Sequence, residues 1–230
     1  MPAAQTSRAI LCIHGGGASP AIFRFQTSSF RAALKDDFDF VYATAPHIAE
    51  PGPDVLPFFA GMEPYYSWFR REHESTEMEV AIFNEAIKAT IDAWENKNPH
   101  SKIVGILGFS QGGVASTMLL WQQQTGFIPW LPKLEFGVLI CSGYSDVATE
   151  YMRDMCRTTG LGEDGTVIKV PTLHLHGRQD GLNLPQSRKM FVTHYSPTTG
   201  KVIEFDGQHE CPKRREDITK VTNYILSLRK

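Results

Sequence analysis

Short apolar runs alternate with longer amphipathic segments along most of the chain. The apolar runs are rich in Val, Ile and Leu, which is typical of buried strands. The longer segments carry apolar residues at helical spacing, as in Val80, Phe83, Ile87 and Ile91. Strands that alternate with helices indicate a mainly parallel sheet of about six strands, covered on both faces and joined by right-handed crossovers. We therefore predict an α/β fold with strands at 10–13, 38–42, 102–109, 136–141, 170–175 and 202–205, and helices at 23–34, 80–94, 113–124, 148–157, 185–193 and 215–228.

The segment 47–78 breaks this alternation. It is long, and it contains Pro51, Pro53, Pro57 and Pro64 together with a run of aromatic residues. A connection of this length and apolar character usually has a function, because exposed apolar side chains need something to cover. We interpret the segment as a lid or substrate-binding insertion, although its aromatic residues could also be ordinary core. The candidates for substrate binding are Phe58, Phe59, Tyr65, Tyr66 and Trp68.

The composition is consistent with one globular domain over residues 1–230. Hydrophobic residues make up 42% of the chain and charged residues 21%, which provides enough apolar material for a covered sheet. The formal net charge of −2 and the lack of a basic stripe argue against a nucleic-acid partner. No stretch of the sequence approaches the roughly 20 apolar residues of a membrane span. The first eight residues contain no apolar signal core.

Cysteine usage bears on the compartment and on metal binding. Four cysteines are widely scattered, without the paired spacings of a disulfide framework or a zinc site. This pattern favours reduced thiols in a cytoplasmic protein, and we expect neither a metal nor an organic cofactor. The cysteines are Cys12, Cys141, Cys156 and Cys211.

Ser110 is the strongest candidate for a nucleophile. It lies in a Gly-x-Ser-x-Gly motif that follows the predicted strand 102–109 and precedes a helix-forming stretch. In that context the motif forms a strained turn that exposes the serine Oγ above the sheet, and Gly108 and Gly112 lack the Cβ atoms that would clash there. The motif alone is common, so its place between a strand and a helix is what makes it informative.

An acid and a base follow the serine in the chain order of an α/β-hydrolase triad. Asp180 follows the predicted strand 170–175, and His209 follows the weaker strand 202–205. Asp146 is a rival for the acid, because it follows strand 136–141 and an acid can come from more than one strand. We favour Asp180. Among the other histidines, we expect His174 and His176 to serve strand packing or local hydrogen bonds, and His47, His73, His100 and His194 to lie at the surface.

The run His-Gly-Gly-Gly at 14–17 follows the first predicted strand. Acyl transfer creates an oxyanion that needs two preplaced N–H donors, one from the residue after the nucleophile and one from the loop after this strand. We assign these donors to the backbone of Gly16 and Gln111. The alternative is a strand-to-helix turn that merely needs glycines, as in nucleotide-binding folds.

Four segments resemble the motifs of the fungal family of serine hydrolases, FSH-type α/β-hydrolases. They are CIHGGG at 12–17, GFSQGG at 108–113, LHGRQD at 175–180 and GQHECP at 207–212, and the match spans nearly the whole chain. The resemblance implies an α/β-hydrolase fold, with Ser110, Asp180 and His209 as the triad. It also implies kinship with carboxylesterases and with trans-acting thioesterases that release polyketides. Many members have a bulkier residue where this chain has Gly16.

These observations predict an enzyme that hydrolyses an ester or thioester through an acyl-serine intermediate. The substrate would be an acyl or polyketide-type chain, which an acyl carrier domain of a synthase could present. Arg70 and Arg71 could contact such a carrier or be solvated charges. Two alternatives stay open, a general short-chain carboxylesterase and a non-catalytic ligand-binding protein on the hydrolase fold. The oligomeric state is not readable from the sequence.

Overall fold

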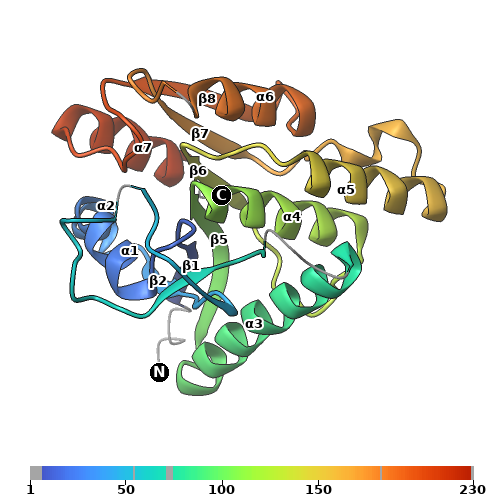
Figure 1. The fold of residues 1–230 in the computed structure, drawn as a ribbon, viewed down its shortest axis with the longest axis horizontal. Coiled ribbons are helices and arrows are strands. Elements are labelled where there is room, and N and C mark those ends of the chain that lie inside the picture. The colour runs from blue at the N-terminus through green and yellow to red at the C-terminus, as the bar shows by residue number, and fades with distance from the viewer. Residues whose placement is uncertain (1–6, 54, 71–74, 182, 229–230) are drawn as a thin grey trace, which may run out of the picture.

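The computed structural model describes residues 7–53, 55–70, 75–181 and 183–228. Its centre is a six-stranded sheet, parallel throughout, in the order β2-β1-β5-β6-β7-β8 (Figure 1). The predicted α/β fold is thereby confirmed. The strands are β1 (Ser7–Ile13), β2 (Asp39–Tyr42), β5 (Ser101–Phe109), β6 (Phe136–Ile140), β7 (Thr172–Gly177) and β8 (Gly200–Phe205).

Helices cover both faces of the sheet, and each face has its own apolar core. One core contains side chains from α1, α2 and α7, and the other contains side chains from α3, α4, α5 and α6 (Figure 1). The strands between them therefore read as continuous apolar runs. The helices are α1 (Pro20–Gln26), α2 (Ser28–Leu34), α3 (Thr76–Lys97), α4 (Gln111–Thr125), α5 (Asp146–Thr159), α6 (Leu184–His194) and α7 (Arg215–Ser227), with a short 3₁₀ turn, η1 (Glu163–Thr166).

Helix α4 is buried on nearly all sides over its first three turns, because it lies between the sheet and helices α3 and α5. Its side chains from Val114 to Gln122 are all buried, and it packs on β5, β6 and α5. A helix with apolar residues all round needs such a position. The helix therefore holds the residue at its N-cap, Ser110, in a fixed place relative to the sheet.

The predicted helix 23–34 is in fact two helices, separated at Thr27. The Oγ1 of Thr27 donates a hydrogen bond to the carbonyl of Phe23 at 2.7 Å and accepts one from the hydroxyl of Tyr42 at 2.6 Å. This buried side chain ties the break to strand β2. Such a tertiary contact cannot be seen in the periodicity of the segment.

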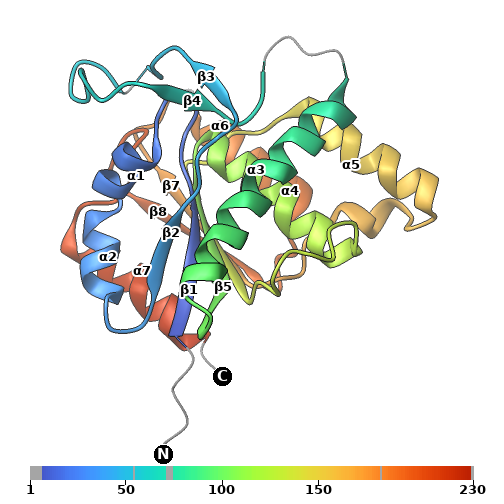
Figure 2. The same ribbon diagram turned by 90° about the horizontal axis from the view of Figure 1, so that it is seen from below.

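The segment after β2 forms a two-stranded antiparallel hairpin, β3 (His47–Ala49) with β4 (Tyr65–Ser67). The hairpin lies over the carboxyl ends of β1 and β5 (Figure 2). Tyr66 fixes it there, because its carbonyl accepts from Gly17 N–H at 2.8 Å and its N–H donates to Ala18 at 2.7 Å. A small apolar cluster packs under it, formed by Ala18, Ile22, Val55, Phe59 and Tyr65.

All six parallel strands end at the same edge of the sheet, so the loops after β1, β5, β7 and β8 lie close together. The hairpin β3-β4 covers part of that edge (Figure 2). In the ranges that the structure describes, no helix is both long and apolar enough to cross a membrane.

Candidate active site

Ser110 stands at the sharp turn between β5 and α4. Its backbone has a φ of 54° and a ψ of −118°, a region that costs of order 1–3 kcal/mol for a residue with a Cβ atom. The turn is held because Ser110 N–H donates to the carbonyl of Ile140 at 3.0 Å. Glycine is required beside it, since a Cβ on Gly112 would lie 2.1 Å from the carbonyl oxygen of Ile13. The strained turn predicted from the motif is thus present.

The imidazole of His209 lies between Ser110 and Asp180. Its Nε2 is 2.9 Å from Ser110 Oγ, and its Nδ1 is 2.7 Å from Asp180 Oδ2. A carboxylate only accepts hydrogen bonds, so Nδ1 carries the proton and Nε2 is free to accept from the serine hydroxyl. The structure therefore brings together the three residues expected from the sequence, in the geometry of a nucleophile, a base and an orienting acid.

Burial and packing fix the orientation of this chain of contacts. Asp180 is buried at the turn after β7, and its Oδ1 accepts from Asn183 Nδ2 at 2.9 Å. The ring of His209 packs against that of Phe109, with centroids 4.9 Å apart. The acid thus has a partner on each oxygen, and the histidine can turn little about its own bonds.

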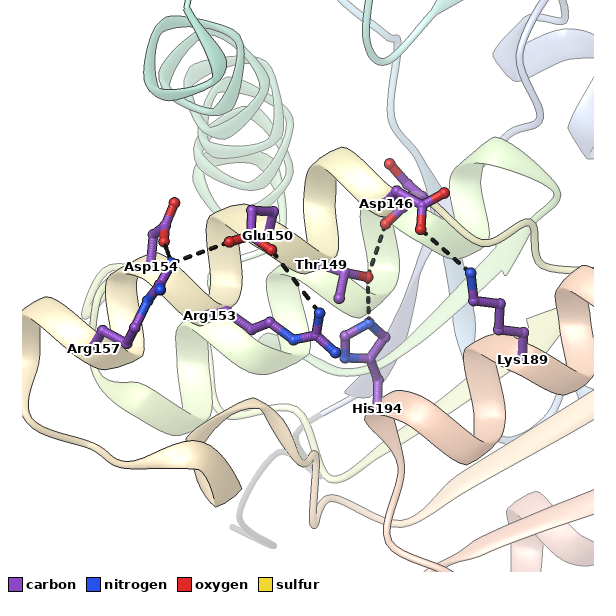
Figure 3. A network of polar contacts seen from close by, with 9 residues as sticks. Asp146, Thr149, Glu150, Arg153, Asp154, Arg157, Lys189 and His194 are labelled. Atoms are coloured by element: carbon purple, nitrogen blue, oxygen red, sulfur yellow. Dashed lines mark hydrogen bonds and ion pairs between the residues drawn. The ribbon is translucent and has the colours of Figure 1, made fainter.

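The rival acid, Asp146, does not reach the histidine. It is the first residue of α5, its side chain is 88% exposed, and its Oδ1 lies 3.3 Å from Lys189 Nζ (Figure 3). A carboxylate at the start of a helix is stabilised by the helix dipole. Its position is explained by that and by the surface ion pair.

The loop after β1 lies directly against Gln111. A Cβ atom on Gly16 would be 2.9 Å from Gln111 Oε1, so a larger residue at this position would require the Gln111 side chain to shift. Within the described part of the chain, the backbone N–H groups of Gly16 and Gln111 form no hydrogen bond. Both residues are half-buried at the same edge of the sheet as Ser110, so their N–H groups are available as the expected oxyanion donors.

The side chain of Gln111 has a role that the motif did not reveal. Its Oε1 accepts hydrogen bonds from Trp68 N–H at 2.9 Å and from Ser67 Oγ at 3.1 Å. The residue after the nucleophile therefore anchors the end of β4 to the elbow. No signal in the sequence links these positions, because they are more than forty residues apart.

His14 supports the glycine-rich loop from below. Burial lowers its pKa to about 4, so the ring is neutral. Its Nε2 accepts from Ala45 N–H at 3.3 Å and its Nδ1 donates to the carbonyl of Gly15 at 2.7 Å. Trp68 Nε1 donates to the carbonyl of His14 at 2.7 Å. These contacts join the glycine-rich loop to the hairpin segment.

A cavity of about 460 Å³ opens beside Ser110. Its walls come from the segment after β4, from α4, and from the first turns of α3 and α5. Most of the lining is apolar, as is usual for a ligand pocket. The apolar side chains on it are Phe69, Val80, Val114, Met118, Tyr144, Val147 and Ala148.

None of the five aromatic residues expected to bind substrate lines this cavity. Trp68, Tyr65 and Phe59 are buried in packing contacts, Tyr66 is half-buried, and Phe58 is 73% exposed on the outside, next to Phe25. Their neighbours Phe69 and Arg70 reach the cavity instead. The segment does contribute to the site, but through the residues at its end. Arg71 and His73 lie outside the described residues.

Two histidines expected at the surface are buried. His47 contacts Glu79 at 2.9 Å, and His194 Nε2 contacts Thr149 Oγ1 at 2.9 Å (Figure 3). Each has a polar partner far away in the sequence, which compensates the cost of burial. His100 is exposed, as expected.

Comparison with known sequences decides the family. A sequence model described as "Serine hydrolase (FSH1)" matches residues 4–221. The chain belongs to this serine hydrolase family. Esterase mlcF of Penicillium citrinum is 48% identical over 229 residues, which cover 96% of this chain and 90% of the relative. A protein of Aspergillus terreus named "Dihydromonacolin L-[lovastatin nonaketide synthase] thioesterase" is 44% identical over 240 residues, 98% of this chain and 93% of the relative.

Solved structures support the α/β-hydrolase fold of this FSH1 family member. Acyl-protein thioesterase 2 of Zea mays superposes with a TM-score of 0.59 at 16% identity, covering 99% of this chain and 96% of that one. A carboxylesterase of Bacillus cereus gives 0.56 at 10% identity, with 98% and 90% covered. At these identities the likeness concerns the fold alone.

Cys141 adds a feature that the FSH1-type motifs did not indicate. It follows β6 with a φ of 44°, and its Sγ lies within 4.8 Å of ligand atoms of Asp180 and His209. Metals bind the thiolate form of cysteine, but burial raises the pKa of Cys141 to about 12. It is therefore a neutral thiol, which donates weakly to the carbonyls of Gln208 and Glu210 at 3.7 Å. These contacts attach the loop that carries His209 to the end of β6.

Proposed function

We propose that this FSH1 family member hydrolyses esters or thioesters through an acyl intermediate on Ser110. The observation that carries the proposal is the 2.9 Å contact between Ser110 Oγ and His209 Nε2, continued at 2.7 Å to Asp180. In this proposal Ser110 is the nucleophile, His209 the general base and Asp180 the acid that fixes the histidine tautomer.

The reaction would proceed in two halves. Ser110 Oγ attacks the acyl carbonyl carbon while His209 Nε2 takes the serine proton, and Asp180 stabilises the imidazolium. The oxyanion of the tetrahedral intermediate accepts hydrogen bonds from the backbone N–H groups of Gly16 and Gln111. His209 then protonates the departing alcohol or thiol. A water molecule, deprotonated by His209, attacks the acyl-serine and releases the acid.

The mostly apolar cavity beside Ser110 supports an acyl chain as the substrate. Its volume of about 460 Å³ lies in the range of small-molecule sites. Because a relative of A. terreus is named as a thioesterase of lovastatin nonaketide synthase, we propose a polyketide-type chain held as a thioester on the carrier domain of a synthase. Thiols need less protonation than amines to leave, so this acid-base apparatus suits thioesters.

We also propose a compartment and a domain organisation for the protein. The four cysteines are free and buried, which supports a reducing compartment, the cytoplasm. We further propose that residues 1–230 form one catalytic domain, in which the hairpin segment shapes the acyl site.

Replacement of the nucleophile tests the proposal. Ser110→Ala should abolish hydrolysis of p-nitrophenyl esters and of acyl N-acetylcysteamine thioesters, and it should abolish labelling by a fluorophosphonate. Circular dichroism should show the same fold as the wild type, because alanine keeps the Cβ of the elbow. Persistent labelling or undiminished turnover in the variant would contradict the assignment.

The chain-length profile then separates a release enzyme from a general carboxylesterase. Hydrolysis that is faster for medium-chain acyl thioesters than for acetyl esters supports the proposed substrate class. A maximum at acetyl esters would favour the general esterase.

A further inference from the structure

Glu79 brings a buried carboxylate to the wall of the mostly apolar cavity. It lies in the first turn of α3, and its side chain is 7% exposed. An ionised carboxylate is costly to bury unless it is hydrogen-bonded. The hydrogen-bond partners of its two carboxylate oxygens therefore decide how Glu79 can be accommodated there.

His47 and Arg70 hold the carboxylate from the side of the hairpin segment. Glu79 Oε2 accepts from His47 Nε2 at 2.9 Å and from Arg70 backbone N–H at 3.1 Å, and Arg70 Nε donates to His47 Nδ1 at 3.0 Å. An arginine Nε only donates, so His47 Nδ1 accepts and the imidazole is neutral, with its proton on Nε2. This network fixes the positions of Glu79 and Arg70 relative to each other.

Both internal hydrogen bonds of the carboxylate end on Oε2. Among the residues that the structure describes, none forms a hydrogen bond with Glu79 Oε1, and no carboxylate forms an ion pair with the Arg70 guanidinium. Two other polar atoms of the lining are already bonded, since Ser145 Oγ caps α5 and Gln111 Oε1 anchors the segment after β4. The cavity wall thus presents a fixed acceptor beside a fixed donor.

We propose that Glu79 and Arg70 bind a hydroxyl group on the acyl chain and so select chains in which a ketone has been reduced to an alcohol. This inference rests on the proposed function. A carboxylate only accepts hydrogen bonds, so its ligand must donate, and a hydroxyl can donate to Glu79 while it accepts from Arg70. The reaction that supplies the substrate is then a carbonyl reduction.

Other substituents on the acyl chain fit the Glu79 and Arg70 wall of the cavity less well. A ketone offers only lone pairs, which would face the carboxylate of Glu79. An ionised acidic group could pair with Arg70, but it would be repelled by the carboxylate of Glu79 and would have no hydrogen to donate to it. An unsubstituted chain would cover buried Glu79 without giving its Oε1 a hydrogen-bond partner, and sites built to bind a hydroxyl reject analogues that lack it.

The test uses acyl N-acetylcysteamine thioesters of one medium chain length. At a given carbon they carry a hydroxyl, a ketone or no oxygen, and that carbon is moved along the chain beyond the positions next to the thioester. At one position the wild type should hydrolyse the hydroxy substrate with a kcat/KM about 10-fold or more above that of either analogue.

Glu79→Gln provides the decisive variant. With the amide oxygen kept on His47, an N–H₂ group replaces Oε1 and can donate to a ketone, so the ratio of hydroxy to keto substrate should fall by about 10-fold. Glu77→Gln is the matched control, because it removes the same charge from the same helix turn at an exposed position. Its ratio should equal that of the wild type.

Arg70→Gln gives a second and different readout, which also serves if Glu79→Gln fails to fold. Arg70 donates to hydroxyl and ketone alike, so this variant should lower the rates of both relative to the unsubstituted chain. A wild type that hydrolyses the unsubstituted thioester but favours the hydroxyl at no position would overturn the inference and leave the proposed function standing. If none of the thioesters or matching methyl esters is hydrolysed, both proposals fall.

Discussion

Two regions meet at the carboxyl edge of the sheet, and they are built in different ways. The loops that carry Ser110, Asp180 and His209 each follow a strand of the central sheet directly, and their key contacts are 2.7 and 2.9 Å long. The hairpin segment 47–70 contributes no strand to that sheet. It is attached by backbone hydrogen bonds of Tyr66 to the loop after β1 and by contacts with Gln111 and His14.

We expect the strand-borne loops to determine the chemistry and the hairpin segment to influence which substrates are accepted. The strand-borne loops have little freedom, because the register of the sheet fixes where each begins. The hairpin segment ends at the cavity and supplies Phe69 and Arg70 to its wall. We therefore expect a change at the end of the hairpin segment to reshape the cavity without moving Ser110, Asp180 or His209.

The largest effect is expected from a substitution in the strand-borne loops. Asp180→Asn should lower kcat by about 10⁴-fold, because an amide that donates to Nδ1 favours the wrong histidine tautomer. Asp146→Asn is the matched control and should change kcat by less than about 2-fold, since that carboxylate is paired with Lys189 at the surface. Steady-state kinetics on one ester measure kcat for both variants and the wild type. Equal losses in both variants would contradict the assignment of the acid.

A smaller effect concerns the contact between the two regions at His14. Its pKa is lowered to about 4 by burial, against about 6.5 in an unfolded chain. Above about pH 6.5 the ring is neutral in both states and contributes no pH dependence. As the pH falls from about 6.5 to about 4, the unfolded state binds a proton that the folded state does not, so the free energy of unfolding falls by up to about 3 kcal/mol.

Urea denaturation across that pH range measures this slope. Buried His174 and His176, with pKa values lowered to about 3 and about 4, add to it in the same direction. His14→Asn should make the slope shallower, whereas His100→Gln, at an exposed position, should not. An unchanged slope in His14→Asn would show that the ring is not held neutral by burial.

The smallest expected effect sharpens the comparison within the acyl site. Val114→Phe narrows the cavity from α4 and should lower kcat/KM for medium-chain thioesters by about 10-fold, with less effect on acetyl esters. Phe58→Ser, on the outer side of the hairpin segment, should leave both within about 2-fold. If Phe58→Ser had the greater effect, the outer aromatic residues rather than the cavity would bind substrate.

The sequence predicts the sheet well, because buried parallel strands are encoded locally as short apolar runs. Each of the six predicted strands overlaps an observed one, and β7 begins later than expected because Pro171 has no N–H to contribute to a ladder. The break of the first helix at Thr27 was missed. It depends on a contact with Tyr42, which no local pattern records.

The candidate site likewise contains residues that local motifs predict and residues that only the fold brings together. Ser110, Asp180 and His209 could be selected because each lies in a short motif after a strand. The cavity could not, since Phe69, Glu79 and Val147 come from three separate segments that only the fold brings together. The burial of His47 was missed for the same reason, as Glu79 lies 32 residues away in the chain.

The most direct test of the account is the mass of the protein during turnover. Wild-type enzyme mixed with an acyl thioester and quenched in acid should gain the mass of the acyl group, and peptide mapping should place that group on Ser110. His209→Ala should accumulate none at the same time point. An acyl group on any other residue, or turnover with no acyl-enzyme at any time, would contradict the central role of Ser110.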